Sequence, residues 1–169
     1  MCMTVAAFGL IPRWAFKPRT VYKAMKVFSN GTIYSPHRHH RYTLGELNTS
    51  KFSYTKQRRF SRDISLGLHV FLTYQDAKDE CDRLKDEVIS FYDPAHLGYT
   101  YEVFECTIPK GAKYYKGIWE YSIRFLTREI PNIVSNRLII NTPATNPAKK
   151  YEGLLTMGSL AGMFETHLS

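Results

Sequence analysis

The stretch from Ile64 to Val88 constrains the fold of this chain more than any other, because a strand pattern there runs directly into a helix pattern. Apolar residues alternate along one face from Leu66 to Leu72, and Phe71 adds bulk to the other face, as in a strand that is covered on both faces. Thr73 ends the strand, and its spacing from Asp76 is that of a capping box at a helix start. The apolar residues that follow share one face of an amphipathic helix: Ala77, Cys81, Leu84 and Val88.

The remaining patterns predict a sheet around this strand and helix. Asn30-Gly31 has the composition of a tight two-residue turn, so the residues on either side of it should form a hairpin. Residues 99–108 and 137–141 also have strand patterns. We therefore predict an α+β fold with a central, mostly antiparallel sheet of about five strands and one principal amphipathic helix at about residues 74–88.

The length of 169 residues is that of about one domain. Prolines at positions 12 and 18 indicate an arm at the start of the chain, and we expect its Trp14 and Phe16 side chains to pack onto the body. The tail has apolar residues at helical spacing, interrupted by glycines, and either docks as a short helix or makes a homo-oligomer contact. The predicted boundaries are 1–20 for the extended N-terminal arm, 21–141 for the single α+β domain and 142–169 for the C-terminal tail.

Composition excludes several classes of protein. A hydrophobic content of 44% excludes a disordered chain, and no apolar run approaches the roughly 20 residues that span a bilayer. Residues 1–10 have no basic residue before them and make a poor signal peptide, so we expect a cytoplasmic protein without a membrane partner. The three cysteines, Cys2, Cys81 and Cys106, are widely spaced, which favours reduced structural thiols over a disulfide framework or a zinc site.

Charge is distributed unevenly along the chain. Residues 1–62 contain 12 Lys or Arg and one acid, Glu46, whereas the remaining residues contain 11 Lys or Arg and 14 acids. A cationic segment on a near-neutral body indicates an anionic partner, such as a nucleotide, RNA or DNA, or an acidic protein surface. A solubilising surface would have the same composition.

The most unusual local composition is a run of three imidazoles and two guanidiniums. These groups can bind phosphate through charge-assisted hydrogen bonds, and the following Tyr42 can stack on a base. An ordinary exposed polar loop and a metal site are the alternatives. Adjacent histidines in a strand point to opposite faces and the arginines repel a cation, so we expect no metal and no cofactor. The residues of this cluster are His37, Arg38, His39, His40 and Arg41.

Residues 51–62 have the composition of a long basic surface loop that follows a nucleic-acid backbone. Its cations would contact phosphates and its aromatic rings would stack on bases without sequence preference. The predicted phosphate-binding residues are Arg58, Arg59 and Arg62, and the predicted stacking residues are Phe52, Tyr54 and Phe60.

Catalytic patterns are sparse. The sequence has no phosphate-binding loop of the Gly-x-x-x-x-Gly-Lys type, no Gly-x-Ser-x-Gly, no His-Glu-x-x-His and no Cys-x-x-Cys. His69 lies within the apolar central strand, where a histidine that hydrogen-bonds a neighbouring carbonyl is the interpretation we prefer to a catalytic one. Catalysis is therefore unsupported, and His69 is the one candidate for it.

Two resemblances accompany these patterns. Tyr22-Lys23 at a first strand, Gly67-Leu-His-Val-Phe-Leu-Thr73 before a helix and a later Lys113-Tyr-x-Lys-Gly117 resemble uncharacterised small domains common in bacteria and their phages. This resemblance covers about residues 21–141 and implies a phage or mobile-element setting, with no activity attached.

The second resemblance is to ADP-ribosyltransferase-like folds, in which a His-x-x-Phe-Thr strand precedes a helix. His69, Phe71 and Thr73 match that pattern in part, since Leu72 separates the last two. The resemblance implies an NAD-dependent transferase with a late glutamate, for which the candidates are Glu102, Glu105 and Glu120.

Our leading hypothesis is a phage-type binding protein of the host cytoplasm that evades host defence. It would capture an anionic ligand, either a nucleotide signal or the nucleic acid of a host defence complex. The alternatives are an ADP-ribosyltransferase-like enzyme that uses NAD and an inhibitor that binds an acidic host protein surface.

Overall fold

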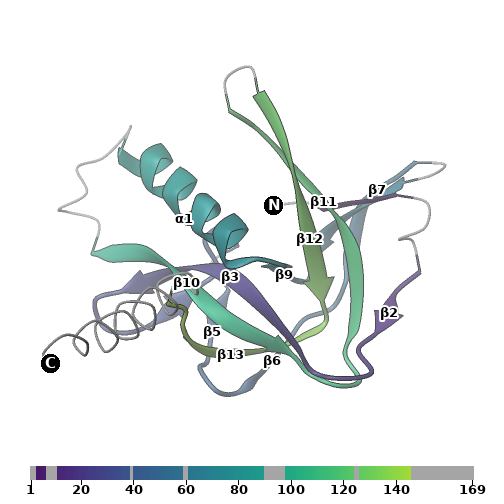
Figure 1. Cartoon of the computed structure of the whole chain (residues 1–169), viewed down its shortest axis with the longest axis horizontal. Coiled ribbons are helices and arrows are strands. Elements are labelled where there is room, and N and C mark those ends of the chain that lie inside the picture. The colour runs from purple at the N-terminus through teal and green to yellow at the C-terminus, as the bar shows by residue number, and fades with distance from the viewer. Residues whose placement is uncertain are drawn as a thin grey trace, which may run out of the picture.

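The computed structural model describes residues 3–6, 11–38, 40–58, 61–89, 98–123 and 126–145 (Figure 1). Within these ranges the chain forms one 13-stranded sheet and one helix. The helix is α1 (Tyr74–Ile89). The strands of the first half are β1 (Met3–Ala6), β2 (Arg13–Trp14), β3 (Arg19–Phe28), β4 (Ile33–Tyr34), β5 (Arg41–Tyr42), β6 (Leu47–Thr49), β7 (Ser53–Arg58), β8 (Ser61–Leu66) and β9 (Leu68–Phe71). Those of the second half are β10 (Tyr99–Ile108), β11 (Lys113–Ile123), β12 (Leu126–Ser135) and β13 (Arg137–Pro143).

The strands run in the order β6-β13-β10-β3-β9-β12-β11-β1-β8-β7, with β2 beside β11 and with β4 and β5 extending from β3. Every pairing between these named strands is antiparallel. The predicted α+β class with a mostly antiparallel sheet and one helix is therefore confirmed in its coarse form. The predicted number of about five strands is wrong, because the main path of the sheet alone contains about twice as many.

Two hairpins account for most of the missed strands. Residues 51–62, predicted as a loop, form most of the β7–β8 hairpin, in which Tyr54 pairs with Ile64 and Gln57 with Arg62. The second hairpin, β11–β12, contains Pro131, which pairs with Ile118. Pairing of β12 with β9 begins at the next residue, Asn132, so the missing amide hydrogen of Pro131 costs no bond to β9.

The predicted helix and its cap are confirmed. The Thr73 hydroxyl accepts a hydrogen bond from the Asp76 amide at 3.1 Å and donates one to the Asp76 carboxylate at 2.6 Å. Ala77, Cys81 and Leu84 are buried against Phe71, Trp119 and other apolar residues of the sheet. Figure 1 shows α1 lying across one side of the sheet, beside β3, β9 and β10.

The predicted Asn30-Gly31 hairpin is also present, with β3 and β4 on either side of the turn. Gly31 has a φ of +79°, and the Asn30 side chain accepts hydrogen bonds from the Thr32 amide and hydroxyl. Alternation along β3 places Val21 and Met25 in the core on the side of the sheet away from α1, and Ala24 in the core under α1. This alternation also fixes the direction of Lys23, as described below.

The N-terminal arm and the tail are described only in part. Phe16 is 86% exposed and Trp14 is 51% exposed, so neither aromatic side chain packs onto the body as expected. The tail beyond residue 145 lies outside the described residues. No helix within the described residues is long and apolar enough to cross a membrane.

The predicted central strand is divided at Gly67. β8 pairs with β1 and β7, whereas β9 pairs with β3 and β12, so the chain changes its place in the sheet at this one residue. Gly67 has a φ of +139°, and a Cβ atom there would lie 2.2 Å from Val134 Cγ1. The sheet thus folds back on itself, and a glycine forms the corner because a side chain would clash.

We predict that Gly67→Ala lowers the free energy of unfolding by about 3 kcal/mol, from backbone strain and from the clash with Val134. Urea denaturation measures this change. Gly31→Ala is the matched control, because its φ is also positive but no atom lies within 4 Å of its Cβ position; it should cost only about 1 kcal/mol. Equal losses in the two variants would show that Val134 does not restrict residue 67.

Candidate functional site

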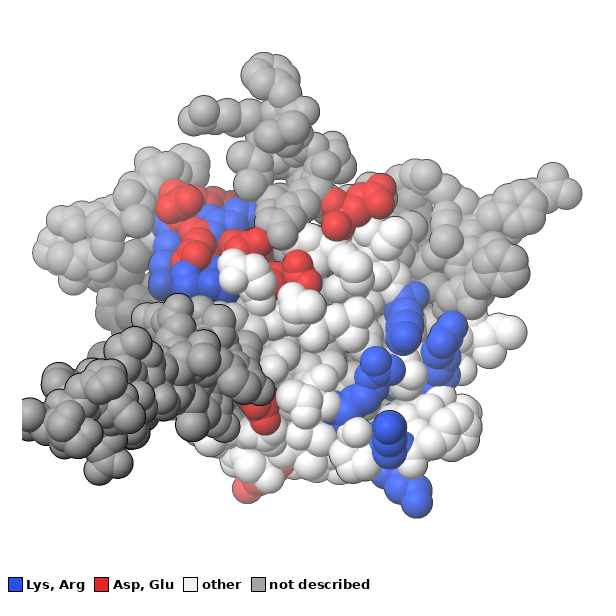
Figure 2. Space-filling model, viewed as in Figure 1, with Lys and Arg blue, Asp and Glu red and all other residues white. Residues whose placement is uncertain are grey.

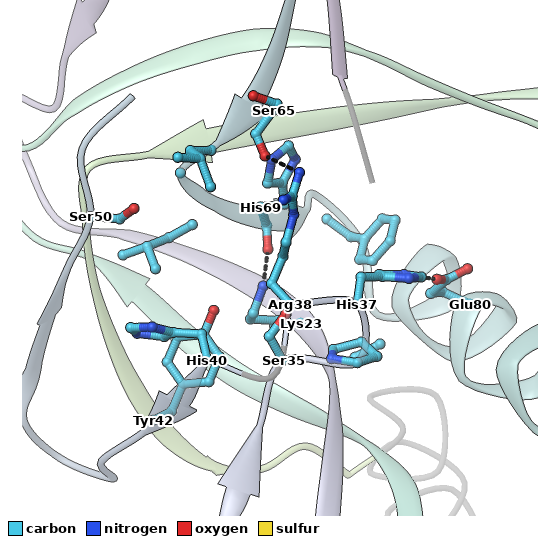
Figure 3. Close-up of a pocket in the computed structure, with 16 residues that line it drawn as sticks. Lys23, Ser35, His37, Arg38, His40, Tyr42, Ser50, Ser65, His69 and Glu80 are labelled. Carbon is cyan, nitrogen blue, oxygen red and sulfur yellow. Dashed lines mark hydrogen bonds and ion pairs between the residues drawn. The ribbon is translucent and has the colours of Figure 1, made fainter. Parts of the chain in front are cut away.

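A cavity of about 250 Å³ opens where β3 and β9 separate (Figure 3). The two strands pair at Tyr22 and Phe71 and at no other described position. Beyond that pair, the cavity is lined by Lys23 of β3, by His69 of β9, by the connection from Ser35 to Tyr42 and by Glu80 of α1. Residues far apart in the sequence therefore meet at a break in the sheet.

Lys23 forms one wall of this cavity. It lies between Val21 and Met25 in the alternation of β3, so its side chain enters the face of the sheet that holds the core, and it is 5% exposed. Its ammonium group donates a hydrogen bond to the His69 carbonyl and lies 5.5 Å from the centre of the Tyr42 ring. Burial lowers the pKa of Lys23 to about 8.

The lysine–carbonyl bond spans the gap between the two strands. Apart from the Tyr22–Phe71 pair, β9 has no described pairing with β3, and His69 pairs with Val134 of β12 on the other side. Lys23 crosses the gap and satisfies that carbonyl with its side chain. No acid is close enough to contribute to the shifted pKa of Lys23, so this buried cation lacks a matching carboxylate among the described residues.

The His69 ring lies in a different environment from its carbonyl. Both ring nitrogens are buried, and neither has a hydrogen-bond partner within the described part of the chain. Burial, followed by the charge of Lys23, lowers the pKa of His69 to about 3, so the ring is neutral near pH 7. The predicted hydrogen bond from this ring to a neighbouring carbonyl is not found.

A buried carboxylate, that of Glu80, lies at the side of the cavity away from His40 and Tyr42 in Figure 3. Glu80 has a fully buried side chain and lies 3.0 Å from His37 Nε2. Arg83 binds the same carboxylate through two nitrogens, at 2.8 and 3.1 Å. Glu80 therefore contacts both His37, in the connection that lines the cavity, and Arg83, on α1. The negative charge of Glu80 already has partners.

Three more predicted residues line the cavity. Arg38 is exposed and donates a hydrogen bond to the Ser65 carbonyl at 3.4 Å. His40 is exposed and its ring meets the Tyr42 ring edge-on, with the ring centres 4.9 Å apart. Tyr42 is 6% exposed, so it is a wall of the cavity with little free surface for stacking.

The other predicted site residues fall into two groups. Arg41 is exposed and Phe52 packs edge-on against Tyr115, and neither lines the cavity. For the rest the structure gives no side-chain position. His39, Arg59 and Phe60 lie outside the described residues, and Tyr54, Arg58 and Arg62 are described only as backbone of β7 and β8.

Two lining residues, Lys23 and Glu80, were not predicted from the sequence. The position of Lys23 could have been noticed in the sequence, because this lysine lies between Val21 and Met25 on one face of a strand that is buried on both faces. Glu80 lies next to Cys81 on the buried side of α1, but the sequence does not show which basic residues a helical acid pairs with.

The cavity is cationic in character, with Lys23, Arg38 and the imidazoles of His37 and His40 around one carboxylate that is already paired. Hydroxyl groups of Ser35, Ser50 and Ser65 also line it. No group of three or more His, Cys, Asp or Glu side chains placed to hold a metal occurs among the residues that the structure describes. Comparison of the chain with protein-family models, with curated proteins and with solved structures found no match.

The buried His69 ring should make stability depend on pH. Its pKa is about 3 in the folded chain and about 6.5 in an unfolded one, so the unfolded state binds the extra proton as pH falls between these values. We predict that acidification from about pH 6.5 to about pH 4 removes on the order of 3 kcal/mol of unfolding free energy through this residue. Urea denaturation of the wild type and of His69→Leu across that range measures the effect; identical pH slopes would contradict it.

Proposed function

We propose that this chain is a binding protein that captures a small anionic ligand, of the phosphate-bearing or nucleotide class, in the cavity between β3 and β9. One observation carries the proposal: the ammonium of Lys23 is buried beside the cavity with a carbonyl as its hydrogen-bond partner and no described carboxylate to balance it. Burying an unmatched charge is costly, and an anion in the cavity would supply the missing partner.

The remaining basic side chains of the cavity support the same ligand class. Arg38 offers a fork of donors, and His37 and His40 add imidazoles on either side of it in the sequence. Lys23 and Arg38 line the cavity together from different elements, and Glu80, the one acid among the described lining residues, is paired with His37 and Arg83. The cavity therefore favours negative charge.

The size of the cavity favours a small ligand over a nucleic-acid chain. A volume of about 250 Å³ is just below the roughly 300–1,000 Å³ of typical small-molecule pockets. A phosphate with a compact attached group fits that scale, whereas a nucleic-acid chain would need a continuous groove. The resemblance of residues 21–141 to small phage and bacterial domains implies only a phage or mobile-element setting; in that setting, a nucleotide signal of a host defence system would be a ligand of the proposed class.

Calorimetric titration with inorganic phosphate, AMP and cyclic AMP tests the proposal. We expect binding at pH 7 that weakens as salt rises and as pH is raised above about 8, where Lys23 loses its proton. Arg38→Gln should weaken it, whereas Lys85→Gln, which removes an exposed charge on α1 outside the cavity, should not. Absence of heat with all three probes would refute the proposal.

Lys23→Met separates a binding role from a structural one. We predict that it abolishes anion binding while the free energy of unfolding at pH 7 stays equal or rises by up to about 2 kcal/mol, because a buried charge is removed and one carbonyl loses its donor. Urea denaturation and the same titration measure the two effects. A large loss of stability would instead assign Lys23 to the scaffold.

The ADP-ribosyltransferase-like hypothesis is a second candidate, favoured by the presence of the His69 ring in the cavity without a described partner. Its glutamate is less well supported, because Glu102 and Glu105 do not line the cavity and the Glu120 side chain is outside the described residues. Incubation with NAD distinguishes the two functions, since only the enzyme releases nicotinamide, and His69→Ala should abolish that release.

A further inference from the structure

The segment from Ile11 to Lys17, here called the arm strip, exposes three large apolar side chains within seven residues. Phe16 is 86% exposed, Ile11 78% and Trp14 51%. Arg13 and Lys17 lie among them and are exposed as well. Large apolar side chains gathered on a surface in this way indicate a binding site.

The backbone of the arm strip is held in place. Arg13 and Trp14 form β2 and pair with Tyr114 and Lys113 of β11. The next residue, Ala15, is buried, and it donates a hydrogen bond to the Ala112 carbonyl at 2.9 Å and accepts one from the Gly111 amide at 2.8 Å. The exposed rings therefore project from a fixed strand edge, which lowers the entropy lost when a partner binds.

The surface around the arm strip is cationic. Lys113 places its ammonium 4.6 Å from the centre of the Trp14 ring, and Lys110 is exposed in the turn that follows β10. No acid occurs between positions 11 and 45 of the sequence. Figure 2 shows Lys and Arg without acids among them on the side of the molecule where Figure 1 places β2, whereas the helix side carries both charges.

This combination matches one partner class best. Sequence-tolerant binding of single strands needs cations for successive phosphates and exposed aromatic faces for the bases between them. The arm strip carries both groups, with the rings of Trp14 and Phe16 flanked by Arg13 and Lys17. An acidic protein surface would be matched by the cations but would leave the exposed rings of Trp14 and Phe16 without a role.

We propose that the arm strip, together with Lys110 and Lys113, binds single-stranded nucleic acid through phosphate contacts and stacking of bases on Trp14 and Phe16. This surface shares no residue with the lining of the cavity between β3 and β9. The proposal therefore stands independently of the small-ligand function, and the chain would have two separate sites for anions.

Fluorescence anisotropy with a fluorescein-labelled oligothymidylate of about 12 nucleotides tests the surface, at about 50 and about 200 mM salt. We expect binding that weakens as salt rises. Trp14→Ala and Phe16→Ala should each lower the affinity by about 5- to 150-fold, the range that corresponds to loss of one stacking ring. Leu47→Ala is the matched control, since Leu47 is 52% exposed on β6, and it should leave the affinity unchanged.

Charge and cavity variants complete the test. Lys17→Gln should weaken oligonucleotide binding and Lys85→Gln should not, and Lys23→Met should leave it intact, which separates this surface from the cavity. Affinity that is lost in Lys23→Met but kept in Phe16→Ala would overturn the proposal. Binding to phosphatidylserine vesicles without binding to the oligonucleotide would also overturn it, and would assign the strip to a membrane surface.

Discussion

The separation of β3 from β9 is the constraint on which the rest of the site depends. A sheet interior normally satisfies each backbone group through its neighbour, but these strands meet at Tyr22 and Phe71 and then diverge. No pairing of β3 with β9 is described at His69, and the Lys23 side chain donates a hydrogen bond to the His69 carbonyl across the gap. The same divergence makes room for the cavity. The geometry of the sheet therefore buries the Lys23 ammonium beside this cavity.

Gly67 allows β9 to lie beside β3 although the preceding strand, β8, lies elsewhere in the sheet. β8 and β9 are consecutive in the sequence, yet β12, β11 and β1 lie between them in the sheet. Only a sharp corner in the chain allows both placements, and the Val134 side chain fills the space that a Cβ atom at residue 67 would need. Gly67 thus permits the sharp turn that this strand order requires, and Lys23 places a positive charge in the gap between β3 and β9.

Local patterns in the sequence predicted local structure well. The Thr73–Asp76 cap, the helix after it and the Asn30-Gly31 turn depend on neighbouring residues and are all present. Strand pairing was harder to predict, because it depends on residues far apart. β7, β8 and β12 carry charged residues or a proline, and their partners rather than their own composition make them strands.

The candidate site was predictable in part for the same reason. His37, Arg38, His40 and Tyr42 stand out by composition and do line the cavity, together with the predicted catalytic candidate His69. Lys23 and Glu80 enter it from a strand and a helix whose positions only the folded sheet determines. Phe16 and Trp14 were expected to be packed, and the hydrogen bonds of Ala15 show that the backbone can be anchored while the rings beside it stay exposed.

The Glu80 carboxylate, which both His37 and Arg83 contact, couples the local unfolding of two segments. Residues 37 and 80 are 43 positions apart, and their contact joins the cavity-lining connection directly to α1. Local opening of this connection must break a bond to a buried charge, while unfolding of α1 must release the connection. The two segments should therefore lose their amide-hydrogen protection as one cooperative unit, so that the wall of the cavity is as long-lived as the helix behind it.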